Sequence, residues 1–249
     1  MIHGPEGYPT GSLDDDAVLG AYPWPVDDGE RRWVRAMMVT TLDGASAGPD
    51  GLSGSISSSV DKQVFDAVRR RADAVLVGAS TIREEGYGAM RAKPEDADQR
   101  AAHDQRPAPV LAIVSGSLDL PWDSELFAES SERPVVLTGA DPDADALARA
   151  REHAHVVTAP DDVTPQFLVD ALTGRGLPRI VCEGGPGLLE SLVRADVVDE
   201  ADITLSPTFA GLGERKQTDG LPAVVGFDLV HVLEAEGFLM NRYVRGSGR

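Results

Sequence analysis

The stretch Val181-Cys182-Glu183-Gly184-Gly185-Pro186-Gly187-Leu188-Leu189 decides which fold the sequence predicts. It begins as an apolar run, stops at a carboxylate and two glycines, and continues with leucines at helical spacing. The proline falls where a first helical turn tolerates it. The pattern predicts a strand, a tight turn and a helix N-terminus, whose free N–H groups and dipole suit a phosphate. A tight connection without any ligand is the alternative.

Strands and helices are predicted to alternate on both sides of this junction. Apolar runs predict strands over residues 33–40, 74–78, 110–115, 135–139, 156–157, 180–182 and 203–205. Helical spacing predicts helices over residues 60–71, 79–85, 143–153, 164–172 and from residue 188. This order is typical of an α/β fold with a mostly parallel central sheet flanked by helices. Residues 227–234 and 238–244 are predicted to form a C-terminal antiparallel hairpin.

Composition limits the class of protein. The 249 residues are enough for one buried core. Residues 1–32 are predicted to be an extended N-terminal arm with a short helix near 14–20, followed by a main domain over 33–249. The charged segment 95–105 is predicted to be an exposed loop or helix. With no apolar run of about 18 residues and no signal-peptide pattern, a cytoplasmic location is the default expectation.

Charge and cysteine content narrow the partners. A net charge of −18 argues against nucleic acid and anionic membranes, although a few arginines could still bind a small anion. The single cysteine excludes an intramolecular disulfide. We expect no metal site, because the five histidines show no ligand spacing except the pair His153 and His155. That pair is expected to straddle a helix end and a strand start.

Common catalytic motifs are absent from the sequence. There is no G-x-S-x-G elbow, no Walker sequence and no G-x-G-x-x-G. The strand ends at Gly78, Ser115 and Gly184 are the candidate ligand sites, since ligands of open α/β sheets bind at the carboxyl ends of strands. Backbone-rich loops with hydroxyls and arginines suit a cofactor that carries its own chemistry.

Several segments together resemble the reductase domain of riboflavin biosynthesis, the RibD C-terminal-domain family, which has a dihydrofolate-reductase-like fold. The matching segments, in order, are Thr41-Leu42-Asp43-Gly44, residues 72–83, Glu183-Gly184-Gly185-Pro186, residues 189–200 and residues 206–211. Residues 83–88 resemble the stand-alone actinobacterial type of pyrimidine-reductase-like protein. The resemblance implies NADPH as cofactor, a homodimer and a small pyrimidine or pteridine substrate.

The resemblance also implies roles for particular residues. Asp61 and Glu183 would be catalytic, with Glu183 on the substrate side. Arg69 and Arg91 would hold the substrate phosphate, and Glu85 would lie near cofactor and substrate. NADPH would contact Ser57, Gly78, Ser80, Thr81, Ser115, Gly184, Gly185, Pro186, Gly187, Leu188 and Leu189. The alternatives are a solvated first-turn carboxylate for Asp61 and a solvated helix end for Arg69.

The family activity implied is NADPH-dependent reduction of a phosphoribosylaminopyrimidine, by hydride transfer to the ribose C1 imine. Two other functions stay open. One is a reductase of drifted specificity, including dihydrofolate reduction. The other is a non-catalytic NADPH-binding protein, because Ala45 stands where the family often has lysine. The zinc-deaminase motifs that many relatives carry in a fused domain are absent.

Overall fold

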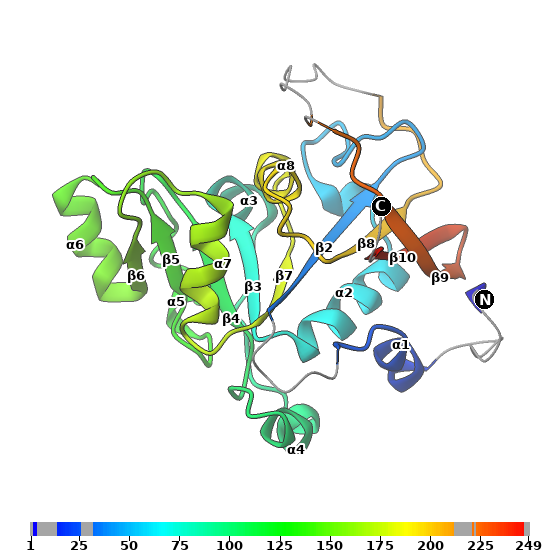
Figure 1. The fold of residues 1–249 in the computed structure, drawn as a ribbon, viewed down its shortest axis with the longest axis horizontal. Coiled ribbons are helices and arrows are strands. Elements are labelled where there is room, and N and C mark those ends of the chain that lie inside the picture. Colours follow the sequence, from blue (N-terminus) through cyan, green and yellow to red (C-terminus); the bar gives the residue numbers. More distant parts are fainter. Residues whose placement is uncertain (1, 4–13, 26–31, 212–220, 222, 247–249) are drawn as a thin grey trace.

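Among the residues that the structure describes, ten strands form one sheet (Figure 1). The computed structural model describes residues 2–3, 14–25, 32–211, 221 and 223–246. The strands lie in the order β1-β9-β10-β8-β2-β7-β3-β4-β5-β6. Their bounds are β1 Ile2–His3, β2 Trp33–Thr40, β3 Ala74–Gly78, β4 Val110–Val114, β5 Val135–Thr138, β6 His155–Thr158, β7 Arg179–Cys182, β8 Glu200–Leu205, β9 Phe227–Ala235 and β10 Phe238–Arg245.

The helices predicted from the sequence are present to within a few residues, and α5 is a short helix that was not predicted. The bounds are α1 Asp15–Ala21, α2 Ser59–Arg71, α3 Ala79–Glu85, α4 Ala97–Ala102, α5 Glu125–Ala128, α6 Ala144–His153, α7 Pro165–Thr173 and α8 Pro186–Arg194, with short 3-10 turns η1 Ser53–Ser55 and η2 Pro94–Asp96. Side chains of Ser58, Asp143 and Thr164 cap α2, α6 and α7 by accepting first-turn N–H groups.

The predicted fold class is confirmed. Strands β8, β2, β7, β3, β4, β5 and β6 run parallel to one another. β9 and β10 form the predicted antiparallel hairpin, which extends the sheet beyond β8. The parallel part places the ends of β2, β7 and β3 next to one another, and it is there that the candidate site lies.

Both faces of the parallel strands are buried. Along β3, Ala74 and Leu76 pack on the face that α7 and α8 cover, whereas Val75 and Val77 pack on the opposite face against α3, α5 and α6. This alternation is the two-residue period of a strand. α1 and α2 pack beside the latter layer, over β2 and the hairpin. Strands covered on both sides explain the near-continuous apolar runs in the sequence.

The described part of the N-terminal arm packs on the main domain. α1 buries Val18 and Leu19, and Tyr22 just after it is 2% exposed. The carbonyl of Pro23 accepts a 3.0 Å hydrogen bond from Arg35 in β2. Residues 14–25 are therefore part of the core beside α2, while residues 4–13 and 26–31 of the predicted arm lie outside the described residues.

The prediction that residues 95–105 are exposed is wrong for two charged side chains. Asp96 and Arg100 are 4% and 2% exposed. Asp96 accepts hydrogen bonds from Arg70 at 2.6–2.9 Å. Arg100 donates to the carbonyls of Arg70 and Ala72, where α2 ends. A cation at a helix C-terminus satisfies the last carbonyls and the dipole, so polarity in the sequence did not imply exposure.

Candidate active site

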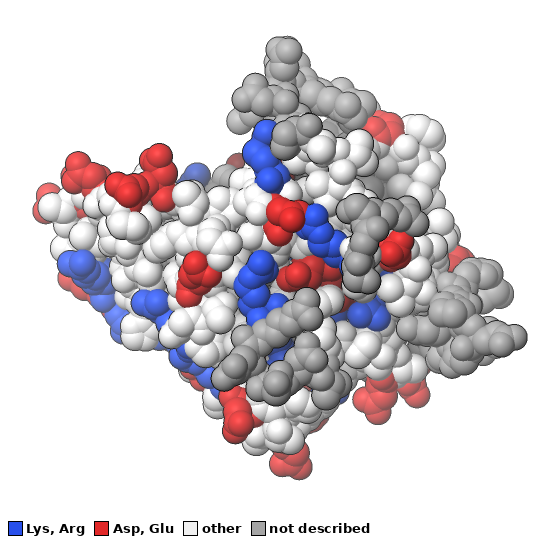
Figure 2. Space-filling model, in the orientation of Figure 1, with Lys and Arg blue, Asp and Glu red and all other residues white. Residues whose placement is uncertain are grey.

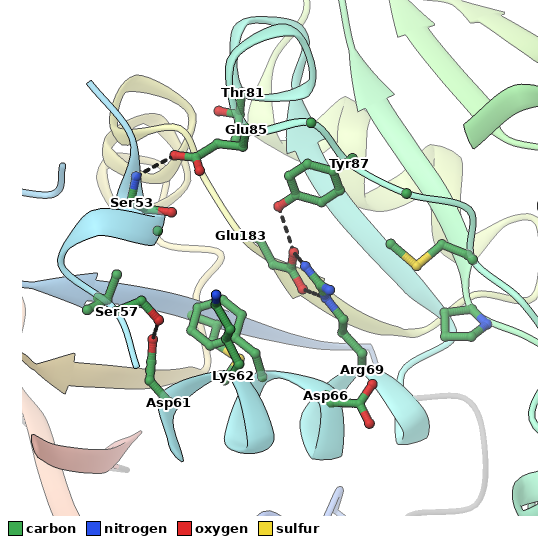
Figure 3. Close-up of a pocket in the computed structure, with 18 of the residues that line it drawn as sticks. Ser53, Ser57, Asp61, Lys62, Asp66, Arg69, Thr81, Glu85, Tyr87 and Glu183 are labelled. Atoms are coloured by element: carbon green, nitrogen blue, oxygen red, sulfur yellow. Dashed lines mark hydrogen bonds and ion pairs between the residues drawn. The ribbon is translucent and has the colours of Figure 1, made fainter. Parts of the chain in front are cut away.

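A cavity of about 800 Å³ lies where β2, β7 and β3 end. Figure 3 shows α2 below it, with the loop before α2, the segment that follows α3 and the turn after β7 around it. The volume is within the range of about 300–1,000 Å³ that is usual for small-molecule sites. Nine of the residues predicted for the site line it: Ser57, Asp61, Arg69, Thr81, Glu85, Arg91, Glu183, Gly185 and Pro186.

The two glycine turns that follow β3 and β7 pack against each other beside the cavity. The N–H of Gly78 donates to the carbonyl of Gly184 at 2.8 Å. Gly184 has a φ of +92°, a backbone conformation that residues with a side chain rarely adopt. A Cβ on Gly185 would lie 3.0 Å from Thr81 Oγ1. The predicted strand, turn and helix are confirmed, and α8 begins at this turn without a side-chain cap.

Arg69, Glu183 and Tyr87 form one hydrogen-bonded cluster in the cavity wall (Figure 3). Arg69 Nε and Nη2 donate to Glu183 Oε1 and Oε2, each at 2.5 Å. The Tyr87 hydroxyl donates to Glu183 Oε2 at 2.7 Å. The Glu183 side chain is 1% exposed and that of Arg69 is 32% exposed. The carboxylate is thus covered, whereas the guanidinium is partly accessible, and both residues line the cavity.

Burial and the charge of Glu183 together explain the shifted pKa values of Arg69 and Tyr87. Burial by itself lowers the pKa of Arg69, but the facing carboxylate of Glu183 outweighs it and holds the pKa above its ordinary range. Burial, and then the charge of Glu183, raise the pKa of Tyr87 well above its ordinary value. Arg69 therefore stays cationic, and Tyr87 keeps its proton and remains a donor at neutral pH.

A second polar group lies at the start of α2. The Asp61 residue is 1% exposed although it lines the cavity. Its Oδ2 accepts from the Ser57 hydroxyl at 2.6 Å, and its N–H donates to Ser58 Oγ. Burial raises the pKa of Asp61, while the hydrogen bonds from Ser57 and Thr204 oppose the shift. The solvated first-turn interpretation is wrong, because the carboxyl group is buried.

Glu85 and Arg91 line the cavity through contacts with neighbouring loops. Glu85 Oε1 accepts from the backbone N–H of Ser53 at 2.8 Å, which ties the loop before α2 to α3 (Figure 3). Arg91 is 3.3 Å from Glu125 and also pairs with Glu129, both in or beside α5. Its side chain is 53% exposed, so its charge is shared with two acidic neighbours near solvent.

Seven predicted cofactor residues lie outside the cavity lining. They are Gly78, Ser80, Ser115, Gly184, Gly187, Leu188 and Leu189. Ser115 is 3% exposed, and its hydroxyl accepts from the N–H of Leu118, so it stabilises its own turn. Leu188 and Leu189 pack against the core from α8. Gly78 and Gly184 hold the ends of β3 and β7 together beside the cavity, through the hydrogen bond from the Gly78 N–H to the Gly184 carbonyl.

Tyr87 and Lys62 are among the residues of the wall that the sequence interpretation missed. Tyr87 belongs to the segment 83–88 that carried the resemblance, but aromatic character alone did not indicate its contact with Glu183. Lys62 extends from α2 into the cavity between Asp61 and Arg69 (Figure 3). It places a cation in this cavity even though Ala45 replaces the lysine that the family often has.

Two of the segments that carry the resemblance lie side by side at the end of β2. The N–H of Leu42 donates to the carbonyl of Thr208 at 2.9 Å. Asp43 Oδ2 accepts from the N–H of Gly211 at 2.8 Å. Asp43 therefore joins the loop after β2 to the segment after β8 by a hydrogen bond. We assign it no role in catalysis.

Charges are mixed on the face that Figure 2 shows. Basic and acidic side chains alternate over its middle, and acidic ones gather at the end that carries α6. Within the described ranges, no group of three or more His, Cys, Asp or Glu residues could hold a metal ion. None of the helices described is long and apolar enough to cross a membrane.

Comparison with known proteins identifies the family. The RibD C-terminal domain matches residues 32–236, so the chain belongs to that family. The solved structure of a pyrimidine reductase-like protein from Corynebacterium diphtheriae is 26% identical, with a TM-score of 0.78 over 92% of this chain and 97% of that one. The family predicted from the sequence is confirmed.

Two archaeal relatives are similar in sequence over most of both chains. Each is named 2,5-diamino-6-ribosylamino-4(3H)-pyrimidinone 5′-phosphate reductase. The protein of Archaeoglobus fulgidus is 24% identical over 73% of this chain and 83% of its own length. The protein of Methanothermobacter thermautotrophicus is 26% identical over 73% of this chain and 80% of its own.

Proposed function

We propose that this protein is an NADPH-dependent reductase of a ribosylaminopyrimidine 5′-phosphate in riboflavin biosynthesis. Family membership and the names of the archaeal relatives support the reaction class. The observation that carries the proposal is that a glycine turn, a buried carboxyl group and an oriented arginine line the same cavity. The cavity would hold the cofactor and the substrate together, with the hydride donor of the cofactor beside the acceptor carbon of the substrate.

The glycine turn fits a dinucleotide. A Cβ on Gly185 would lie 3.0 Å from Thr81 Oγ1, and Gly184 has a φ of +92°, so glycine is favoured at both positions of this turn. Backbone N–H groups at the start of α8 suit a pyrophosphate, and Thr81 offers a hydroxyl beside them. Gly185, Pro186 and Thr81 would hold NADPH, which supplies a hydride when bound.

The substrate would occupy the part of the cavity above α2. In the proposed reaction the hydride bonds to C1 of the opened ribosylamine, the C=N electron pair moves to nitrogen, and that nitrogen takes a proton. Asp61, whose pKa burial raises, or water would give this proton. Arg69 uses its Nε–Nη2 edge for Glu183, so its Nη1 edge is the one available for the substrate phosphate.

We also propose that the protein acts as a homodimer. Large apolar side chains lie exposed around the loops at the end of β2 and on the hairpin: Leu42 is 50% exposed, Phe209 76% and Leu229 53%. Exposed apolar groups of this size favour a protein partner. Light scattering on the purified chain measures this directly, and a monomer mass at working concentration would contradict it.

Turnover of the archaeal relatives' substrate with NADPH tests the proposed function. We expect NADPH absorbance to fall only when enzyme and pyrimidine are both present. Dihydrofolate is the second substrate to assay, because a buried carboxyl group at the start of α2 would also suit a pteridine ring. Turnover of dihydrofolate alone would favour drifted specificity. Binding of NADPH by fluorescence without turnover of either compound would favour a non-catalytic protein.

A further inference from the structure

Tyr87 reaches the cavity because α3 ends at a glycine. Gly86 adopts a left-handed conformation with φ +64° and ψ 52°, which terminates the helix and reverses the chain. Both flanking residues then contact the site. Glu85 holds the backbone of Ser53, and Tyr87 turns toward Glu183 (Figure 3).

Tyr87 completes the set of donors around a buried carboxylate. Glu183 Oε2 accepts from Arg69 Nη2 and from the Tyr87 hydroxyl, at 2.5 and 2.7 Å. The aromatic ring lies under the guanidinium, with Arg69 Cζ 5.5 Å from the ring centroid. A cation at this distance from a ring face is attracted to it. Tyr87 therefore contacts both members of the ion pair.

The consequence for Arg69 is a fixed orientation. A free arginine side chain loses much of its rotamer freedom when it binds a ligand. Glu183 holds the Nε–Nη2 edge in place, and the ring of Tyr87 limits rotation of the guanidinium plane. An arginine ordered in advance binds an anion more tightly, because the ordering cost is already met within the protein.

We propose that Tyr87 is a positioning residue for substrate binding. It fixes Glu183, and with Glu183 it fixes the Arg69 guanidinium so that the Nη1 edge receives the phosphate of the substrate. The inference rests on the proposed function, since it assigns a ligand group to the same cavity. It adds a residue whose contribution is specific to the charged end of the substrate.

Two variants of Tyr87 and one matched control separate positioning from folding. Tyr87→Phe removes only the hydroxyl, and Tyr87→Leu also removes the ring. The control is Tyr243→Phe, on β10 outside the cavity lining. Each variant is assayed with the ribosylaminopyrimidine 5′-phosphate and with the same compound after removal of the phosphate. NADPH affinity and melting temperature are measured in parallel.

We expect Tyr87→Phe to raise KM for the phosphorylated substrate about 3- to 10-fold, the usual effect of one hydrogen bond. Tyr87→Leu should raise it further. KM for the dephosphorylated compound, kcat and NADPH affinity should stay within about 2-fold of wild type, as should all values for the control. In an Arg69→Ala background, Tyr87→Phe should have no further effect, because the residue acts through Arg69.

Two outcomes would overturn the inference. Equal losses with both substrates would make Tyr87 a structural residue only. An unchanged KM in Tyr87→Phe, when Arg69→Ala raises it, would remove Tyr87 from phosphate binding. The proposed function fails separately, if the wild-type protein turns over neither compound.

Discussion

The Arg69 guanidinium and the Glu183 carboxylate form a two-bond ion pair across the candidate site, with both N–O distances at 2.5 Å. The two residues lie 114 positions apart, on α2 and directly after β7. Sequence reasoning gave them separate roles, one for the phosphate and one for the reacting part of the substrate. The pairing means that neither side chain can change without affecting the other.

The first prediction concerns this ion pair. Arg69→Ala leaves the Glu183 carboxylate buried without its cation, and we expect the free energy of unfolding to fall by about 3 kcal/mol. Arg69→Ala/Glu183→Ala should recover part of this loss, since no unpaired charge remains. Urea unfolding of the wild type and the variants measures both values. Equal stability of the single variant and the wild type would mean that the pair is not formed in solution.

The same variant tests the phosphate contact. Arg69→Ala should raise KM for the phosphorylated pyrimidine about 10- to 100-fold, as expected for a charge-assisted hydrogen bond. Turnover of an unphosphorylated substrate such as dihydrofolate, if present, should change little. Steady-state assays with both substrates measure the ratio, and equal losses would exclude a role for Arg69 in phosphate recognition.

Asp61→Asn should separate stability from activity. Burial raises the folded-state pKa of Asp61 above 3.8, so the native state holds this proton more tightly than the unfolded chain. The wild type therefore loses stability as pH rises from about 3.8 through the raised pKa. The variant lacks this cost, and its melting temperature should exceed that of the wild type at pH 7 but not at acid pH.

The activity of Asp61→Asn should fall at least about 10-fold in kcat/KM, because an amide cannot supply the proton. Lys62→Gln, which changes a neighbouring charge on α2, is the control for the change in melting temperature. Unchanged activity together with increased stability would leave Asp61 without a catalytic role, whatever its burial.

Gly185→Ala tests the packing of the two glycine turns. The added Cβ would lie 3.0 Å from Thr81 Oγ1, so the Thr81 side chain must give way by a few tenths of an ångström. We expect a lower melting temperature and weaker NADPH binding. Thr81→Ala in the same chain removes the colliding atom and should restore the melting temperature. Failure of the double variant to recover stability would place the strain elsewhere in the turn.

A buried charge cluster under the hairpin gives the last prediction. Glu200 is fully buried, with Arg35 Nη2 at 2.9 Å and Arg242 Nε at 2.6 Å from its Oε1. Burial alone raises the pKa of Glu200, but the two arginines outweigh it and lower the pKa below 4.5. The stabilisation is present above pH 4.5 and is lost as pH falls through the lowered pKa.

Glu200→Gln should therefore cost about 3–5 kcal/mol at neutral pH, the usual effect of breaking a buried pair. The difference from the wild type should narrow in acid. A constant difference at all pH values would contradict the assignment of Glu200 as ionised.

The sequence predicts the positions of individual strands, helices and turns well. Strand and helix positions follow from apolar periodicity, and the glycine turn at 184–185 follows from its neighbours alone. Helical spacing predicted α2 over residues 60–71, and the structure begins it one residue earlier, at Ser59. Burial of charged groups was predicted poorly, as Asp96 and Arg100 show. A charged residue is buried only when a partner from elsewhere meets it, and spacing along one segment does not contain that information.

The sequence by itself determined the α/β class, the order of the strands and helices, the family and the region where a ligand would bind. Those properties depend on short-range pattern and on the order of motifs. Only the tertiary structure decided that Arg69 pairs with Glu183, that Tyr87 joins them and that Ser115 lies outside the cavity. These contacts join residues from strands and helices far apart in the chain. Their geometry depends on the order of the strands in the sheet and on where each helix ends. Gly86, for example, ends α3 and so directs Tyr87 toward the cavity.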